Sequence, residues 1–190
     1  MKKESKYFIA IIPPSPIYDE ALAWKHFFRD NYQSKASLNS PPHITLHMPF
    51  MWKEEKENVL IEKLNAFSNS HSSLSVQLRN FSCFEPRVIF IDIVKTEELA
   101  SLQKEMERFC KKTFQLFNAD YRDLAFHPHI TLAFRDLKKP VFTKAWGEVK
   151  EKQMSSSFIA DRFVLLKHNG MSWDVFKEFP FSNRHQAKIL

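Results

Sequence analysis

The sequence predicts an α+β protein built as an approximate duplication of one pattern. Segments with the period-two spacing of β-strands alternate along the chain with segments of helical spacing. The second half repeats the order of the first: a helix, a loop ending in Pro-His, a strand, a helix and two paired strands. The pentapeptide Pro-His-Ile-Thr-Leu also occurs twice, at residues 42–46 and 128–132. Together these observations favour a pseudo-symmetric molecule.

The first strand and helix are marked by their apolar residues. Residues 7–12 form a short aromatic and β-branched run that ends at two prolines, which predicts a buried strand. Residues 15–32 carry apolar side chains at helical spacing, and Pro16 suits an early helical position. Residues 34–42 are polar and end in prolines, so we expect a loop there.

The rest of the first half predicts three strands and a second helix. Residues 43–50 are predicted as a strand, and residues 53–70 as a charged helix with one apolar face. Residues 74–78 alternate between apolar and polar, as a half-buried strand should. Residues 88–93 form another apolar strand, and we expect residues 79–87 to be the hairpin loop between the two.

The second half begins with a helix over residues 96–117. Thr96 suits the N-cap, and acidic Glu97 and Glu98 suit the first turn of a helix. The capping box is incomplete because Leu99 stands where a Glu or Gln would complete it. We expect a loop at residues 120–128, a strand at 129–134 and a short helix at 140–152.

The chain closes with a strand pair and a polar tail. Residues 158–167 and 173–181 are predicted as strands joined by a turn at Asn169-Gly170. We expect one domain over residues 1–190, with lobes at approximately 1–94 and 95–181 and a frayed C-terminal tail at 182–190.

Composition sets bounds on function. The chain has 190 residues, of which 44% are hydrophobic and 26% charged, as in ordinary globular proteins. Only two glycines are present, which excludes a Gly-rich phosphate loop. The net charge of +6 suits a phosphate-bearing partner but also occurs without one. Cys83 and Cys110 lack the spacing of a zinc site, and no apolar run approaches the roughly 20 residues of a membrane span. We therefore expect a cytoplasmic protein with no membrane partner.

The repeated pentapeptide carries the chemistry. In a strand, His43 and Thr45 point to one face while Ile44 points to the other, and His129 and Thr131 repeat the arrangement. Histidine has an unperturbed pKa of about 6.5, so one imidazole can accept a proton while another donates one. A threonine hydroxyl can hold a phosphate oxygen. The pair suits in-line attack at phosphorus and needs no metal or other cofactor.

Other interpretations of these residues stay open. A single His-x-Thr triplet is common by chance, and a duplicated core strand that has lost its chemistry would look the same. The histidines at 127 and 129, and those at 43 and 47, also raise the question of a metal. Acidic ligands are sparse beside them, with only Asp120, Asp123 and Asp136 near the second motif.

The paired motifs, the duplicated layout and the length resemble the 2H phosphoesterase superfamily. This superfamily includes the bacterial 2′-5′ RNA ligase-like proteins and the cyclic nucleotide phosphodiesterases, and the resemblance covers residues 7–181. It implies a two-lobed α+β fold, with antiparallel sheets backed by helices and a central groove. It also implies that His43 and His129 are the acid–base pair and that Thr45 and Thr131 bind phosphate. The implied reaction is hydrolysis or transfer at a 2′,3′-cyclic phosphate or 2′-5′ phosphodiester of RNA or a nucleotide, and hydrolysis is expected rather than ligation.

The segments after the two motifs depart from the family pattern. Members often carry an aromatic residue or Lys and then Phe-Leu-Gly after the first motif, whereas residues 47–50 here read His-Met-Pro-Phe. The second motif is often followed by Ala-Arg, whereas residues 133–135 here read Ala-Phe-Arg. These differences limit what the family implies about the substrate.

Strand parity adds further candidate residues for substrate binding. If no bulge intervenes, His47 shares the face of the first motif and Arg135 shares that of the second. Each would then contact phosphate or ribose, unless it points into water at the end of its strand. Phe84, Phe126 and Phe134 could stack on a base, although packing in the core is the default for a chain with 19 Phe residues.

Three functions therefore compete. The leading prediction is a phosphodiesterase acting on an RNA end or a nucleotide. The alternative from another class is a nucleotide- or RNA-binding module with the same fold and no turnover, in which His43→Ala would only weaken binding. The third is metal-dependent hydrolysis, which a chelator would abolish. The sequence leaves open which histidine is the acid, and it leaves open the oligomeric state.

Overall fold

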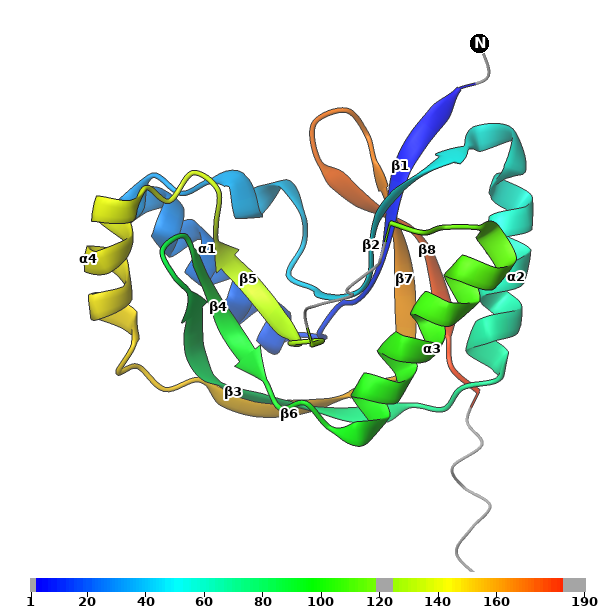
Figure 1. Cartoon of the computed structure of the whole chain (residues 1–190). Coiled ribbons are helices and arrows are strands. Elements are labelled where there is room, and N and C mark those ends of the chain that lie inside the picture. The colour runs from blue at the N-terminus through cyan, green and yellow to red at the C-terminus, as the bar shows by residue number, and fades with distance from the viewer. Residues whose placement is uncertain (1–2, 119–124, 183–190) are drawn as a thin grey trace, which may run out of the picture.

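The computed structural model describes residues 3–118 and 125–182, and over these residues it contains one antiparallel sheet with helices against it (Figure 1). The strands are β1 (Glu4–Ile11), β2 (Ile44–Lys53), β3 (Leu74–Phe84), β4 (Val88–Ile93), β5 (His129–Ala133), β6 (Ser155–Ala160), β7 (Arg162–His168) and β8 (Trp173–Pro180). The helices are α1 (Ile17–Tyr32), α2 (Glu57–Asn69), α3 (Glu97–Phe114) and α4 (Lys139–Val149), with short 3₁₀ helices η1 (Ala36–Asn39) and η2 (Glu54–Lys56). The predicted α+β class with antiparallel strands backed by helices is confirmed.

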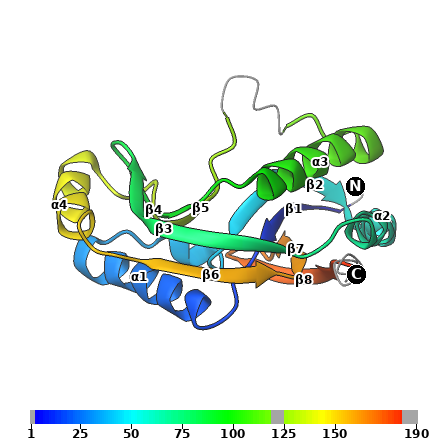
Figure 2. The same ribbon diagram turned by 90° about the horizontal axis from the view of Figure 1, so that it is seen from below.

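The sheet curls so that its two ends form two lobes (Figure 1). The strand order is β6-β3-β4-β5-β2-β1-β7-β8, and every neighbouring pair is antiparallel. Helix α1 packs on β5 and α4 in one lobe, while α2 and α3 pack on β8 and β2 in the other. Figure 2 shows the same separation of the helices from below. The lobes meet where β5 lies beside β2.

The two lobes are interleaved in sequence, so the predicted boundary at residues 94 and 95 does not divide the sheet. Strands β5 and β6 belong to the second half of the chain, yet they pair with β4 and β3. Strand β7 also follows that boundary, and it pairs with β1. Each lobe therefore takes strands from both halves, because hydrogen bonding to an open sheet edge decides the neighbour of a strand whatever its place in sequence.

The core lies between the sheet and the helices. Tyr7, Ile9 and Ile11 of β1 are buried in the main core, which runs through both lobes. The alternate residues of β1 point to the other face, as the period of two requires. That face carries a smaller apolar cluster made of Phe8, Ala10, Val164 and Leu166. Strand β1 is therefore covered on both faces, and this smaller cluster supports the region described below.

Two predicted boundaries are wrong. Residues 79–87 are not all a loop, because β3 continues to Phe84 and turns only over residues 85–87. Residues 158–167 are not one strand, because the chain breaks at Asp161 between β6 and β7. The break has a clear cause: β6 pairs with β3 in one lobe and β7 pairs with β1 in the other.

Two local predictions are confirmed. The Leu99 backbone N–H donates to Thr96 Oγ1 at 3.2 Å, so Thr96 is the N-cap of α3. Gly170 has a φ of 104°, which suits the predicted turn between β7 and β8. The predicted loop at 120–128 lies largely outside the described residues, and the tail lies outside them beyond Ser182. Among the described residues, no helix is both long enough and apolar enough to cross a membrane.

Candidate functional site

The two His-x-Thr tetrapeptides lie on neighbouring strands at the junction of the lobes. Ile44 of β2 pairs directly with Ile130 of β5 in antiparallel register. Both side chains are fully buried in the core, as are Leu46 and Leu132 two positions further on. The apolar residues of each tetrapeptide thus anchor it from behind, as their spacing predicts.

The histidines and threonines occupy the opposite face. Continuing the register of the isoleucine pair by one residue each way sets His43 opposite Thr131 and Thr45 opposite His129. All four side chains are half-buried, and directly opposite residues of an antiparallel pair have Cβ atoms about 4.5–5.5 Å apart. The duplication therefore sets each histidine across the strand pair from the threonine of the other motif.

The same local contact orients both imidazole rings. His43 Nδ1 lies 2.7 Å from the carbonyl oxygen of Pro41, and His129 Nδ1 lies 2.8 Å from that of His127. A carbonyl only accepts hydrogen bonds, so Nδ1 must carry the proton in each case. This leaves Nε2 of each ring able to accept a proton when the ring is neutral and to donate one when it is charged. The proline between the two partners holds the backbone extended.

The surroundings of His43 favour its neutral form. Burial lowers the pKa of His43 to about 4, and the nearby positive charge of Lys25 acts in the same direction. Lys25 is only 1% exposed, and its Nζ donates to the carbonyl oxygens of Ser37 and Ser40, at 2.9 Å each. Burial lowers the pKa of Lys25 to about 7. The sequence does not mark this lysine, because nothing in the helical pattern of α1 separates a buried lysine from an exposed one.

His129 is enclosed by aromatic rings. Its ring centroid lies 4.9 Å from that of Phe90 and 5.3 Å from that of Phe84. Burial lowers the pKa of His129, and a positive charge on His127 would lower it further. Asp92 opposes both effects by favouring the charged imidazole. The two histidines therefore share one backbone geometry but have different electrostatic neighbours.

Asp92 is a buried carboxylate that the sequence did not mark. It is 5% exposed and pairs across the sheet with His129. Its Oδ1 accepts from His127 Nε2 at 2.9 Å, and its Oδ2 accepts from Arg79 Nε and Nη2 at 2.9 and 2.6 Å. A buried charge needs such partners. The only signal in the sequence was a lone acidic residue inside the apolar run of β4.

A small cavity joins the two motifs. It has a volume of about 180 Å³ and combines Thr45 from β2 with His129 from β5. Its other lining residues are Phe84, Ala125, Phe126, His127 and Pro128. Two of the three predicted stacking residues thus lie at the site, and Phe84 is 40% exposed there. The third, Phe134, packs under Arg135 instead.

The structure overturns His47 as a phosphate contact. Ala10 of β1 is opposite Thr45, but the next residue back, Ile9, is already opposite His47. This β-bulge inserts one extra residue into β2 and turns His47 to the core face. The side chain is 0% exposed and packs on Phe50, with 5.5 Å between ring centroids. Strand parity does not predict this direction, because a bulge depends on the partner strand.

Arg135 lies beyond the end of its strand. β5 ends at Ala133, and Arg135 has a φ of 58°, so strand parity no longer sets its direction. The guanidinium lies over the ring of Phe134, 5.0 Å from its centroid. It lines a larger cavity together with Lys6, His168 and other residues, and it does not line the cavity that holds Thr45 and His129.

No group of three or more His, Cys, Asp or Glu side chains within residues 3–118 and 125–182 lies close enough together to hold a metal ion. Asp120 and Asp123, two acidic residues near the second motif in the sequence, lie outside the described residues.

Comparison with known proteins gives relatives over nearly the whole chain. The family model described as "2'-5' RNA ligase superfamily" matches residues 13–171. A protein of Geobacillus sp. strain WCH70 named "Putative phosphoesterase" is 29% identical over 185 residues, which are 95% of this chain and 99% of the relative. One of the same name from Geobacillus kaustophilus is 30% identical over 178 residues, 92% of this chain and 95% of the relative.

Solved structures share the fold. TT0787 of Thermus thermophilus matches with a TM-score of 0.67 at 19% identity, covering 95% of this chain and all of that one. Escherichia coli LigT complexed with 3′-AMP matches with a TM-score of 0.66 at 17% identity, covering 95% of this chain and 99% of that one. The family match and the shared fold agree with the two neighbouring motifs. The chain therefore belongs to the 2′-5′ RNA ligase superfamily and is a phosphoesterase of the 2H type.

Proposed function

We propose that this protein hydrolyses a 2′,3′-cyclic phosphate or a 2′-5′ phosphodiester of RNA or a nucleotide without a metal ion. The observation that supports the proposal is the pairing of the two motif strands, which sets two imidazoles with protonated Nδ1 atoms and two threonines on one face. The complex of LigT with 3′-AMP supports a nucleotide as the ligand class.

The two histidines divide the proton transfers. Neutral His43 takes a proton at Nε2 from a water molecule as the water oxygen attacks phosphorus. The bond from phosphorus to the leaving 2′ or 3′ oxygen breaks, and protonated His129 gives its Nε2 proton to that oxygen. The assignment follows from the neighbours: Lys25 disfavours a charge on His43, and Asp92 favours one on His129. After the step His43 has gained one proton and His129 has lost one, and proton exchange with water restores both rings.

The threonines hold the phosphate. Thr45 and Thr131 each donate a hydroxyl hydrogen bond to a non-bridging oxygen, whose negative charge grows as the attacking oxygen bonds to phosphorus. Donors placed in advance on rigid strands stabilise that charge without reorganising. Because each threonine lies across from the histidine of the other motif, both sides of the phosphate are contacted by the same pair of groups.

The test is turnover of the four 2′,3′-cyclic nucleotides and a 2′-5′-linked dinucleotide in excess EDTA. Wild type is compared with His43→Ala, His129→Ala and a control, His71→Ala. His71 lies just beyond the end of α2, and its imidazole pairs with Glu105 of α3. We expect both site variants to lose at least about 10³-fold in kcat, while His71→Ala keeps wild-type turnover.

Each other outcome selects a different function. Turnover that is present without EDTA and absent with EDTA would point to a metal-dependent reaction. Nucleotide binding by a folded wild type without any turnover would favour the binding-module alternative, and the absence of both would reject the proposal.

A further inference from the structure

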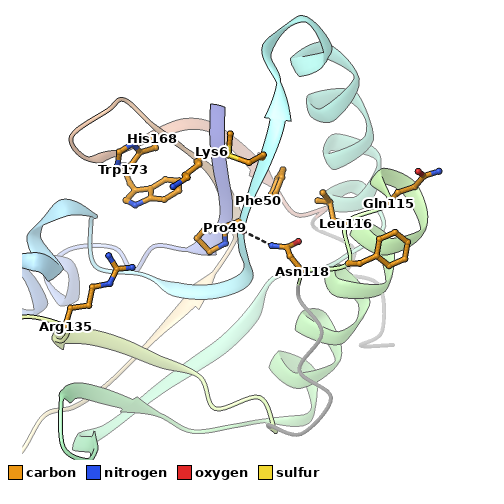
Figure 3. Close-up of a pocket in the computed structure, with 11 residues that line it drawn as sticks. Lys6, Pro49, Phe50, Gln115, Leu116, Asn118, Arg135, His168 and Trp173 are labelled. Atoms are coloured by element: carbon orange, nitrogen blue, oxygen red, sulfur yellow. Dashed lines mark hydrogen bonds between the residues drawn. The ribbon is translucent and has the colours of Figure 1, made fainter. Parts of the chain in front are cut away.

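We propose that a second cavity beside His43 binds a nucleotide next to the scissile phosphate, so that the substrate is an RNA strand and not a lone nucleotide. This inference rests on the proposed function and deepens it. The cavity, called the flanking pocket from here on, has a volume of about 610 Å³. Its key lining residues are Lys6, Asn118, Arg135, His168 and Trp173 (Figure 3).

A line of touching rings connects the flanking pocket to His43. The centroid of the Phe8 ring lies 4.8 Å from that of His43 and 4.7 Å from that of Trp173. Trp173 in turn lies 4.9 Å from His168. These separations are those of rings in direct contact. The flanking pocket therefore begins one ring away from the imidazole that activates water.

The two histidines thus lie between two cavities. Thr45 and His129 line the small cavity, and the Phe8 ring separates His43 from Trp173 of the flanking pocket. A cyclic phosphate on a single nucleotide needs only one such space. A second space of about 610 Å³, within the usual range of ligand pockets, has room for a further nucleotide.

Charge decides which kind of ligand fits. Among residues 3–118 and 125–182, no Asp or Glu lines the flanking pocket, whereas Lys6 and Arg135 each bring a positive charge. Neither cation forms an ion pair with an acidic side chain of the described residues. A neighbouring cavity that shares Lys6 is different, because Glu4 and Glu54 line it. Two cations that have no acidic partner among the described residues favour a ligand that carries phosphate.

The arrangement of side chains suits a base as well as a phosphate. Figure 3 shows Lys6, Trp173 and His168 on one side of the pocket, with Arg135 reaching toward it from the other. Trp173 is half-buried, with one edge on Phe8, and keeps part of its indole open. A base can stack on the indole, a contact that contributes roughly 1–3 kcal/mol in single-strand binders. Lys6 and Arg135 then contact the phosphate that links this base to the next.

The experiment compares two substrates that end in the same group. One is a 2′,3′-cyclic mononucleotide, and the other is a trinucleotide that ends in that same nucleotide cyclic phosphate. The measured quantity is the ratio of their kcat/KM values. For wild type we expect the trinucleotide to be preferred by at least about tenfold, as one stacked base and one phosphate contact would give.

Variants of the flanking pocket should reduce this preference. We expect Trp173→Ala and Lys6→Glu each to lower the ratio by about five- to tenfold. Lys104→Ala, an exposed lysine on α3, serves as the matched control and should leave the ratio unchanged. Lys6→Glu keeps the Phe8–Trp173 contact, so it tests the pocket even if Trp173→Ala perturbs His43. A wild type without preference, or a preference that survives both variants, would overturn the inference.

Failure of the proposed function gives a separate result. If wild type hydrolyses neither substrate, the proposed function fails, and the pocket is tested by fluorescence anisotropy with a labelled 3′-phosphorylated trinucleotide. Weaker binding to Lys6→Glu and Trp173→Ala than to wild type would still support the pocket. Equal affinities for all three proteins, or equal competition by inorganic polyphosphate and RNA, would reject it.

Discussion

At the scale of single residues, the two histidines are distinguished by their neighbours and not by their motif. Both rings make the same contact to a carbonyl two residues back. His43 faces a buried lysine, whereas His129 faces a buried carboxylate. A duplication thus supplies two equal groups. In the proposed mechanism, nearby charges then favour the neutral form of His43 and the charged form of His129. Lys25 and Asp92 tune the pKa values of the two histidines in this proposal.

Replacing Lys25 tests that assignment. We expect Lys25→Met to raise the pKa of His43 above its value of about 4, because removing a nearby cation makes the charged imidazole less unfavourable. The pKa of Lys25 is about 7, so the lysine is charged where His43 titrates. The shift is measured by NMR titration of the His43 ring protons. Lys25→Arg keeps the charge and serves as the control, and an unshifted pKa in Lys25→Met would contradict the argument.

Thr45 allows a test of the hydroxyl alone. Thr45→Val keeps the branched shape and removes the donor to the phosphate, so we expect kcat to fall by roughly 10²–10³-fold, as when one oxyanion donor is removed. Thr143→Val, on the exposed face of α4, is the matched control. Steady-state kinetics with a cyclic nucleotide measures both variants, and a change confined to KM would mean that the hydroxyl binds substrate without favouring the transition state.

At the scale of elements, the strand that carries the second motif also holds the loop that leads to the first. Asp136, just beyond β5, accepts hydrogen bonds from Ser34 Oγ at 2.8 Å and from the backbone N–H groups of Lys35 and Ala36 at 2.8 and 2.9 Å. Ser37 Oγ donates to the Leu132 carbonyl oxygen at 2.6 Å. These bonds fix η1 to β5 and so set the approach of the chain to His43.

Asp136→Ala should therefore affect both stability and activity. Three donors lose a charged acceptor, so we expect the free energy of unfolding to fall by roughly 1–3 kcal/mol. We also expect kcat to fall. Thr96→Ala removes the cap of α3 at the cost of about 1 kcal/mol and is expected to leave kcat unchanged. Urea unfolding and kinetics measure the two effects. If both variants reduce kcat equally, the hydrogen bonds of Asp136 have no specific role in placing His43.

At the scale of the whole molecule, burial of the site governs its pH dependence. The proposed mechanism needs neutral His43 and protonated His129. On that mechanism kcat/KM should rise with pH through about 4 and fall again as His129 loses its proton, at a pH below the usual histidine pKa of about 6.5. We expect a bell-shaped profile with its maximum on the acidic side of neutrality. Initial rates from pH 3.5 to 8.5 measure it, and a flat profile between pH 5 and 8 would count against the two-histidine mechanism.

Stability changes with pH in the same range. The folded-state pKa of His43 lies below its unfolded value, so protonation favours the unfolded chain. This contribution to stability is complete above about pH 6.5 and is lost as pH falls toward 4. Circular dichroism at each pH separates loss of the fold from the gain of a proton by His43. The acid limb of the rate profile is interpreted only where the protein remains folded.

The interleaved lobes predict that neither half of the chain folds alone. A fragment of residues 1–94 retains β1 to β4 but lacks β5, which joins them, and lacks β6 and β7, which cover the edges of β3 and β1. We expect this fragment to show no cooperative thermal transition, because open strand edges and half a core cannot offset the entropy of ordering the chain. Circular dichroism of the fragment measures this. A cooperative transition would indicate an independent lobe.

The sequence by itself determined the local features of this protein. The spacing of apolar residues indicated most strands and helices, and Thr96 and Asn169-Gly170 marked a cap and a turn that the structure confirms. The repeated pentapeptide indicated the family, and the alternation within it put Ile44 and Ile130 in the core. These features depend on residues that lie close together in sequence, so the sequence is enough to predict them.

Only the tertiary structure decided the features that depend on contacts between distant segments. The bulge that turns His47 into the core exists because β2 pairs with β1 in a particular register. The exchange of strands between lobes depends on which sheet edge each strand meets. The different charges around His43 and His129 come from Lys25 and Asp92, which lie on other elements. Strand register and electrostatic interactions depend on residues that are distant in sequence and close in space. The spacing of apolar residues within one strand or helix therefore does not predict them.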